Sequence, residues 1–252
     1  MTAPEPPVDD LPAPVAGLPA PVARWRDAVR ETGVEGVGTI AAAGTGRVRL
    51  GRLPWLPIDH RTVHRLGRDQ VRDIRLRVGP VPVLRVIDAY VDEAGITKIG
   101  PVANVGPEID QGAFLAMWVE AIFWPRTWDH APGLRWEGVD DGHARLHLPF
   151  HDETPVYDVA FDPATGYPQT FEVDRYKTKD RKVRWRAECF DLRAFGGVRA
   201  WGRISATWTD EPGPWYEARF DSIETDVAVD AAIARARRAI GRARGRSARS
   251  GG

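Results

Sequence analysis

The sequence predicts an α+β protein with one large curved antiparallel sheet (a half-barrel) wrapped over two main helices. Strand-like segments with alternating apolar and polar residues follow one another from about residue 36 to 225, separated by turns rich in Gly, Pro and Asp. Only two segments of this body, 21–33 and 108–123, have the apolar spacing of a substantial helix. Because strands do not alternate with helices, we expect neighbouring strands to run antiparallel.

The N-terminal segment, residues 1–20, is rich in proline and begins a short duplication, LPAPVAG followed by LPAPVAR. Proline removes backbone donors and favours extended chain, so we predict a disordered linker. The alternative is a proline-motif ligand for a partner domain. A single domain is expected over 21–226, and its first helix begins near Pro21 and ends at Gly33. The buried stripe of that helix is expected to comprise Val22, Trp25 and Val29.

Short strands are predicted from about 36 to 104. In VRDIRLRV, Ile74 and Leu76 alternate with charged residues, which is typical of a strand with one wet face. A second helix opens at the Gly-Pro-Glu of 106–108 and ends at Pro125. It is apolar on nearly every side, so it should be covered on both sides.

Strands resume after this helix and continue to about residue 225. Asp141-Gly142 is a strong hairpin signal between two of them. From residue 227 the chain is rich in Ala and Arg, and we predict a basic helix from Asp226 followed by a disordered end. The thin apolar stripe of this helix would be Val229, Ile233 and Ile240.

The formal net charge of zero conceals an uneven distribution. Residues 1–23 carry three acids and no base, while 231–252 carry seven arginines and no acid, so the body between them is mildly acidic. This excludes a basic nucleic-acid-binding body, and we expect no specific nucleic-acid recognition. The arginine-rich tail suggests contact with an anionic surface, the alternative being a solvated, solubilising tail.

Several classes of protein are disfavoured by what the sequence lacks. A single cysteine, Cys189, excludes an internal disulfide, and no apolar run approaches the roughly 20 residues of a transmembrane helix. The N-terminus has neither a basic nor an apolar signal region, so a cytoplasmic location is expected. Glycine-rich phosphate motifs are absent, and we predict no cofactor. We also predict no metal, because His143, His147 and His151 would lie about 13 Å apart along a strand.

The order of several short motifs resembles that of a bacterial protein family of unknown function. The motifs are LPAPVARW at 18–25, IDAY at 87–90, GPE at 106–108, VEAIFWP at 119–125, RWEGVDD at 135–141, FEVDRY at 171–176, Gly-Gly-Val at 196–198 and FDSIE at 220–224. The resemblance covers about residues 18–225. It implies a curved half-barrel wrapped over helices, similar to bacterial lipoprotein-sorting and lipoprotein-carrier proteins.

Two helices cannot cover the whole concave face of so long a sheet, so other large side chains must fill the remainder. The tryptophans either close a solid core or line a pocket for an apolar guest, and both readings stay open. Our leading hypothesis is non-catalytic binding of a hydrophobic small molecule or lipid between the sheet and the 108–123 helix. The expected ligand-binding residues are Phe114, Trp118, Ile122, Trp124, Trp136 and Trp185.

The alternative is an isomerase, cyclase or hydrolase that uses general acid–base catalysis on an apolar substrate. Glu120, the only ionisable group of the 113–124 stretch, would be the acid or base, with its pKa raised by burial. Asp174, Arg175 or Tyr176 would polarise the substrate. Otherwise Glu120 is exposed, or paired with an arginine such as Arg175 or Arg186. A structural or interaction protein that uses the proline-rich head and basic tail is a third class.

Overall fold

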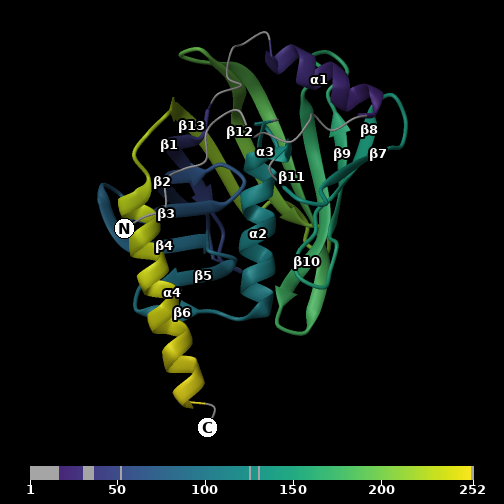
Figure 1. Cartoon of the computed structure of the whole chain (residues 1–252). Coiled ribbons are helices and arrows are strands. Elements are labelled where there is room, and N and C mark those ends of the chain that lie inside the picture. The colour runs from purple at the N-terminus through teal and green to yellow at the C-terminus, as the bar shows by residue number, and fades with distance from the viewer. Residues whose placement is uncertain (1–16, 31–36, 52, 125, 130, 251–252) are drawn as a thin grey trace.

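A computed structural model describes residues 17–30, 37–51, 53–124, 126–129 and 131–250 of the chain. Within this part, thirteen antiparallel strands form one curved sheet in the order β6-β5-β4-β3-β2-β1-β13-β12-β11-β10-β9-β8-β7 (Figure 1). The predicted fold class is therefore confirmed. The strands are β1 (Thr39–Val48), β2 (Leu56–Arg65), β3 (Asp69–Val78), β4 (Val81–Val91), β5 (Ala94–Ile99), β6 (Val102–Asn104), β7 (Arg135–Gly138), β8 (His143–His147), β9 (Val156–Phe161), β10 (Pro168–Thr178), β11 (Arg181–Phe195), β12 (Val198–Trp208) and β13 (Tyr216–Thr225).

The sheet consists of two meanders that join at its centre, where β1 pairs with β13. The chain leaves the first meander at edge strand β6 and enters the second at the opposite edge strand, β7. The connection contains helix α2 (Pro107–Ala121) and the short helix α3 (Arg126–Asp129). Because this connection links the two edges, α2 crosses the concave face and packs against β4, β5 and β10 (Figure 1).

Helix α1 (Ala20–Arg30) and one side of α2 form a solid aromatic core with the second meander. The rings of Trp25 and Trp128 lie 4.8 Å apart, and those of Trp128 and Trp136 lie 5.1 Å apart. The Tyr157 hydroxyl donates a hydrogen bond to the Leu115 carbonyl at 2.8 Å. The predicted α1 stripe is buried, whereas the predicted helix end at Gly33 and most of the proline-rich head lie outside the described residues.

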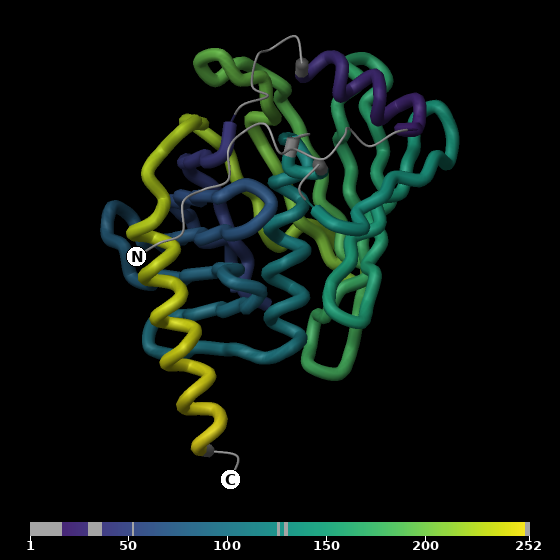
Figure 2. Tube along the Cα trace, viewed as in Figure 1, coloured from purple at the N-terminus to yellow at the C-terminus, as the bar shows by residue number. Residues whose placement is uncertain are grey.

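Helix α4 (Asp230–Ser250) covers the opposite, outer face of the first meander (Figure 2). The predicted stripe is buried there, and Ala236 and Ala243 extend it against outward-facing residues of β1 to β5. The helix begins later than predicted, because Asp226 has a left-handed backbone (φ 55°). The full apolar stripe that packs on the outer face of the sheet consists of Val229, just before the helix, and of Ile233, Ala236, Ile240 and Ala243.

The end of the chain, for which disorder is expected from the sequence, is helical up to Ser250, where α4 ends. Ion pairs join α4 to the body, with Arg237 contacting Asp92 and Arg244 contacting Asp110 at 2.7 Å. Sequence periodicity alone could not show that a sheet face would be available to the thin apolar stripe. Contact between the remaining arginines and an anionic surface stays a prediction. No described helix is long and apolar enough to cross a bilayer.

Candidate ligand-binding site

A cavity of about 370 Å³ lies between α2, the inner face of the first meander and strands β10 to β13. This volume is near the lower end of the range for small-molecule sites. Most of its wall is apolar. The first meander contributes Ile74, Leu76, Leu84 and Val86, and the second meander contributes Trp185, Ile204, Trp208 and Trp215.

The cavity exists because α2 has a side of small residues and a side of large ones. Gly112, Ala113 and Ala116 recur at helical spacing and line the cavity. Phe114 and Trp118 lie on the large side, within the aromatic core. The helix is covered on both sides as predicted. Its large residues pack closely against the second meander, whereas its small residues leave the cavity between the helix and the sheet.

Glu120 lies at one end of the cavity, where three side chains of the first meander bind its carboxylate. His64 Nε2 lies 2.7 Å from Oε2, Gln70 donates to the same oxygen at 3.1 Å, and Arg72 donates to Oε1. Arg72 also lies 3.6 Å from Asp88, which accepts a hydrogen bond from Thr97. The pairing of β2 with β3 places His64 opposite Gln70, so the cluster depends on strand register.

These contacts keep Glu120 ionised. Desolvation by itself would raise its pKa, but Arg72 and His64 together lower the pKa to about 2. Desolvation would likewise lower the pKa of Arg72, but Glu120, Tyr216 and Asp88 together outweigh it and hold that pKa above its usual value. The expectation of a raised pKa is therefore wrong, because the buried carboxylate has a buried cationic partner. That partner is Arg72, and not Arg175 or Arg186.

Arg175 lies in the wall formed by β10 and faces α2. Its guanidinium carbon is 5.2 Å from the ring centroid of Trp185 and 5.7 Å from that of Trp208. A Cβ atom on Gly112 would lie 2.9 Å from its terminal nitrogen Nη2, so the glycine makes room for the guanidinium. Desolvation lowers the pKa of Arg175, and its Nε is buried without a hydrogen-bond partner among the described residues.

Only some of the predicted site residues meet in this cavity. Trp185, Glu120, Arg175 and Tyr176 line it. Trp124 lines a neighbouring cavity of about 60 Å³, which Glu120 also borders. The other four predicted ligand-binding residues lie in the solid aromatic core. Phe114, Trp118 and Ile122 come from α2 and its C-terminal end, on the side away from the cavity, and Trp136 comes from β7.

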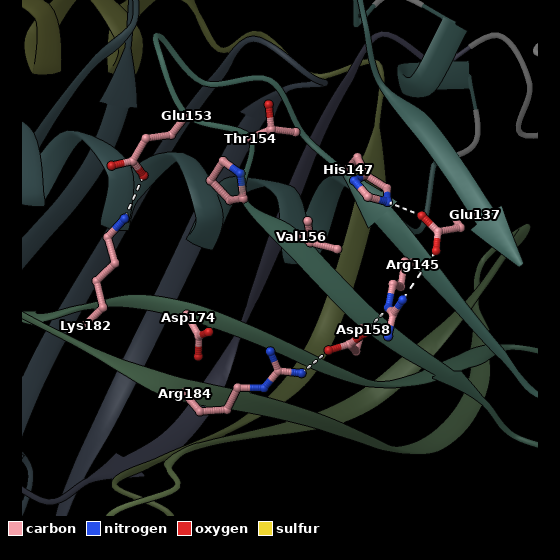
Figure 3. A pocket seen from close by; sticks show the side chains of 11 residues that line it. Glu137, Arg145, His147, Glu153, Thr154, Val156, Asp158, Asp174, Lys182 and Arg184 are labelled. Atoms are coloured by element: carbon pink, nitrogen blue, oxygen red, sulfur yellow. Dashed lines mark hydrogen bonds and ion pairs between the residues drawn. The ribbon is translucent and has the colours of Figure 1, made fainter. Parts of the chain in front are cut away.

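Asp174 lies on the other face of the sheet from the cavity, beside an outer groove shown in Figure 3. Charged residues of β7 to β11 line this groove and largely neutralise one another. Arg145 contacts Asp158 at 3.0 Å, and Lys182 contacts Glu153 at 2.7 Å. Asp174 therefore cannot act on the same small ligand as Glu120.

Sequence reasoning missed most of the cavity wall, including Arg72, Trp208 and Trp215. A signal for one part of it was present, because Ile74 and Leu76 form the apolar side of the alternating β3 strand. No comparable local pattern marks Arg72. It lies on the same inward face of β3 as Ile74 and Leu76, but it is charged, whereas they are apolar. Among the described residues, no three His, Cys, Asp or Glu side chains are grouped to hold a metal ion.

Solved structures to which the chain is similar include a DUF1329 family protein from Desulfovibrio piger, at 14% identity and a TM-score of 0.48. That match covers 86% of this chain and 98% of the other. A LolA superfamily protein from Nitrosomonas europaea is similar at 10% identity and a TM-score of 0.47, covering 82% and 96%. No curated protein matches the sequence. A family model matches residues 11–220, and the chain therefore belongs to the family of unknown function DUF6544.

Proposed function

We propose that this protein binds a hydrophobic small molecule or lipid in the cavity between the curved sheet and α2, without catalysing a reaction on it. The observation that carries the proposal is the mostly apolar cavity of about 370 Å³. If a water molecule takes about 30 Å³, such a space holds roughly a dozen groups of that size. An alkyl chain of medium length matches this volume, and its transfer from water into an apolar cavity is favourable.

The state of Glu120 supports a binding role over acid–base catalysis. A carboxyl group with a pKa of about 2 carries no proton near neutral pH, so it is a poor general acid. Its oxygens accept hydrogen bonds from Gln70 and Arg72 and lie close to His64, and these contacts stabilise the charge and make it a weak base. Asp174, another candidate catalytic group, lies on the opposite face of the sheet.

Intrinsic tryptophan fluorescence tests the proposal, because Trp185, Trp208 and Trp215 line the cavity. Titration with 12-bromododecanol and 12-bromododecanoate should quench a saturable fraction of the emission, since a heavy atom in the cavity lies near these rings. The variant Ala116→Phe adds a ring to the small side of α2 and should weaken this quenching at least tenfold. Its thermal transition, followed by circular dichroism, should remain cooperative.

The matched control is Ala231→Phe, which adds the same ring at an exposed position of α4. This variant should be quenched like the unmodified protein. Absence of saturable quenching by either probe would contradict the proposed function. Equal quenching of folded Ala116→Phe would show that the probes bind somewhere other than the cavity.

A further inference from the structure

Most charged groups that line the cavity have partners within the protein. Glu120, Asp88 and Arg72 form ion pairs or hydrogen bonds with one another or with neighbouring residues, whereas Glu108 and Arg175 form no ion pair among the described residues. Arg175 has no carboxylate within ion-pair distance and no hydrogen bond among the described residues; its close contacts are the faces of Trp185 and Trp208. A guanidinium keeps its charge at any physiological pH, so this partly buried cation sits in a mostly apolar site with Asp88 acting on it only from beyond ion-pair distance.

The surroundings of Arg175 suit an anion. Its Nε is shielded, yet the side chain lines the cavity and stays partly accessible, so the terminal nitrogens are available for a ligand. Indole rings near the guanidinium restrict its orientation, which reduces the entropy lost when it binds a carboxylate or phosphate. Gly112 leaves the space on the helix side that this placement requires.

We propose that the ligand of this cavity is an amphiphile with a single anionic head, and that Arg175 binds the head while the apolar walls enclose the chain. This inference rests on the proposed function and adds a chemical class to it. The head supplies the missing counter-charge, because guanidinium pairs with carboxylate or phosphate through two parallel N–H···O hydrogen bonds. Arg72 is not available to bind the head, since its guanidinium already forms ion pairs with Glu120 and Asp88.

Calorimetric titration with three ligands of one chain length tests the inference: dodecanoate, dodecyl phosphate and dodecanol, each below its micellar concentration. The unmodified protein should bind at least one of the two anions tenfold or more tightly than dodecanol. The anion that binds more tightly identifies the source of the head, a fatty acid or a phosphate ester. Arg175→Gln should remove this preference and leave dodecanol affinity within about threefold.

The control is Arg186→Gln, since Arg186 lies on the neighbouring strand, is directed to the outer face and pairs with Glu172. It should keep the preference for the anion. If Arg175→Gln does not fold, Gly112→Ala decides instead, because its Cβ displaces the guanidinium while alanine favours the helix; it should reduce the preference. Equal affinity of the unmodified protein for all three ligands would overturn the inference of an anionic head and leave the proposed binding of an apolar ligand intact. Absence of binding by every ligand would overturn the proposed function.

Discussion

Replacing Glu120 with glutamine should lower the free energy of unfolding by about 3–5 kcal/mol at neutral pH, the usual range for breaking a buried ion pair. The reason is that Arg72, whose side chain is only 13% exposed, would keep its charge and lose its closest counter-ion. Asp88, 3.6 Å from the same guanidinium, compensates only in part. Urea denaturation followed by circular dichroism measures the change.

The same pair predicts the direction of a pH effect. The pKa of Glu120 falls from a usual value near 4.5 to about 2 on folding, so its contribution to stability is fully present above about pH 4.5. That contribution is lost as the pH falls through this interval, because the carboxylate then takes up a proton. The unmodified protein should therefore lose more stability between pH 5 and about pH 2 than Glu120→Gln does.

The control for both measurements is Glu224→Gln, which makes the same change at an exposed position of β13. Its free energy of unfolding should stay within about 0.5 kcal/mol of the original. A similarly small effect at Glu120 would contradict the ion pair as a source of stability. Parallel pH profiles of Glu120→Gln and the unmodified protein would contradict the assigned pKa shift.

Truncating Ile233 to alanine should cost about 2–5 kcal/mol of unfolding free energy, as expected when a large core side chain is removed. Ile233 is 2% exposed and lies within the stripe of α4 that packs on the outer sheet face. The alanine would leave a cavity between the helix and outward residues such as Val71 and Ile96. Urea denaturation again gives the change in stability.

Arg238→Ala provides the comparison on the same helix, since Arg238 is exposed. It should change the free energy of unfolding by less than about 0.5 kcal/mol. If Ile233→Ala were equally harmless, α4 would not be an integral part of the fold. The packing of α4 also means that deletion of the tail exposes an apolar sheet face, so any surface contact of the tail is better tested by replacing its exposed arginines.

Local patterns predicted much of the secondary structure. The Asp141-Gly142 signal falls within a hairpin, although the loop spans 139–142 and not two residues; Asp140 accepts a hydrogen bond from the Gly142 amide at 2.8 Å there. Alternation in β3 correctly separated the apolar Ile74 and Leu76 from their charged neighbours. Such features depend on residues a few positions apart, whose geometry the backbone determines.

The site was only partly predictable. Glu120 could be singled out because it is the one ionisable group on an apolar stretch of helix, but its neighbours His64, Gln70 and Arg72 lie about 50 residues earlier in the chain. The aromatic residues of α2 were expected to line a pocket because they are large. The structure shows the converse, since large side chains fill space and the small residues Gly112 and Ala116 leave it open.

By itself, the sequence determined the antiparallel class of the sheet, the central apolar helix and the membership in an uncharacterised family. Only the tertiary structure decided which side of α2 faces a cavity, which arginine neutralises Glu120 and which arginine of the cavity wall has no carboxylate within ion-pair distance. The physical reason is the joining of β1 with β13, where Ala42 lies opposite Ile223. Sheet curvature and strand register bring residues that are distant in the chain together, and no pattern within a single segment can predict these contacts.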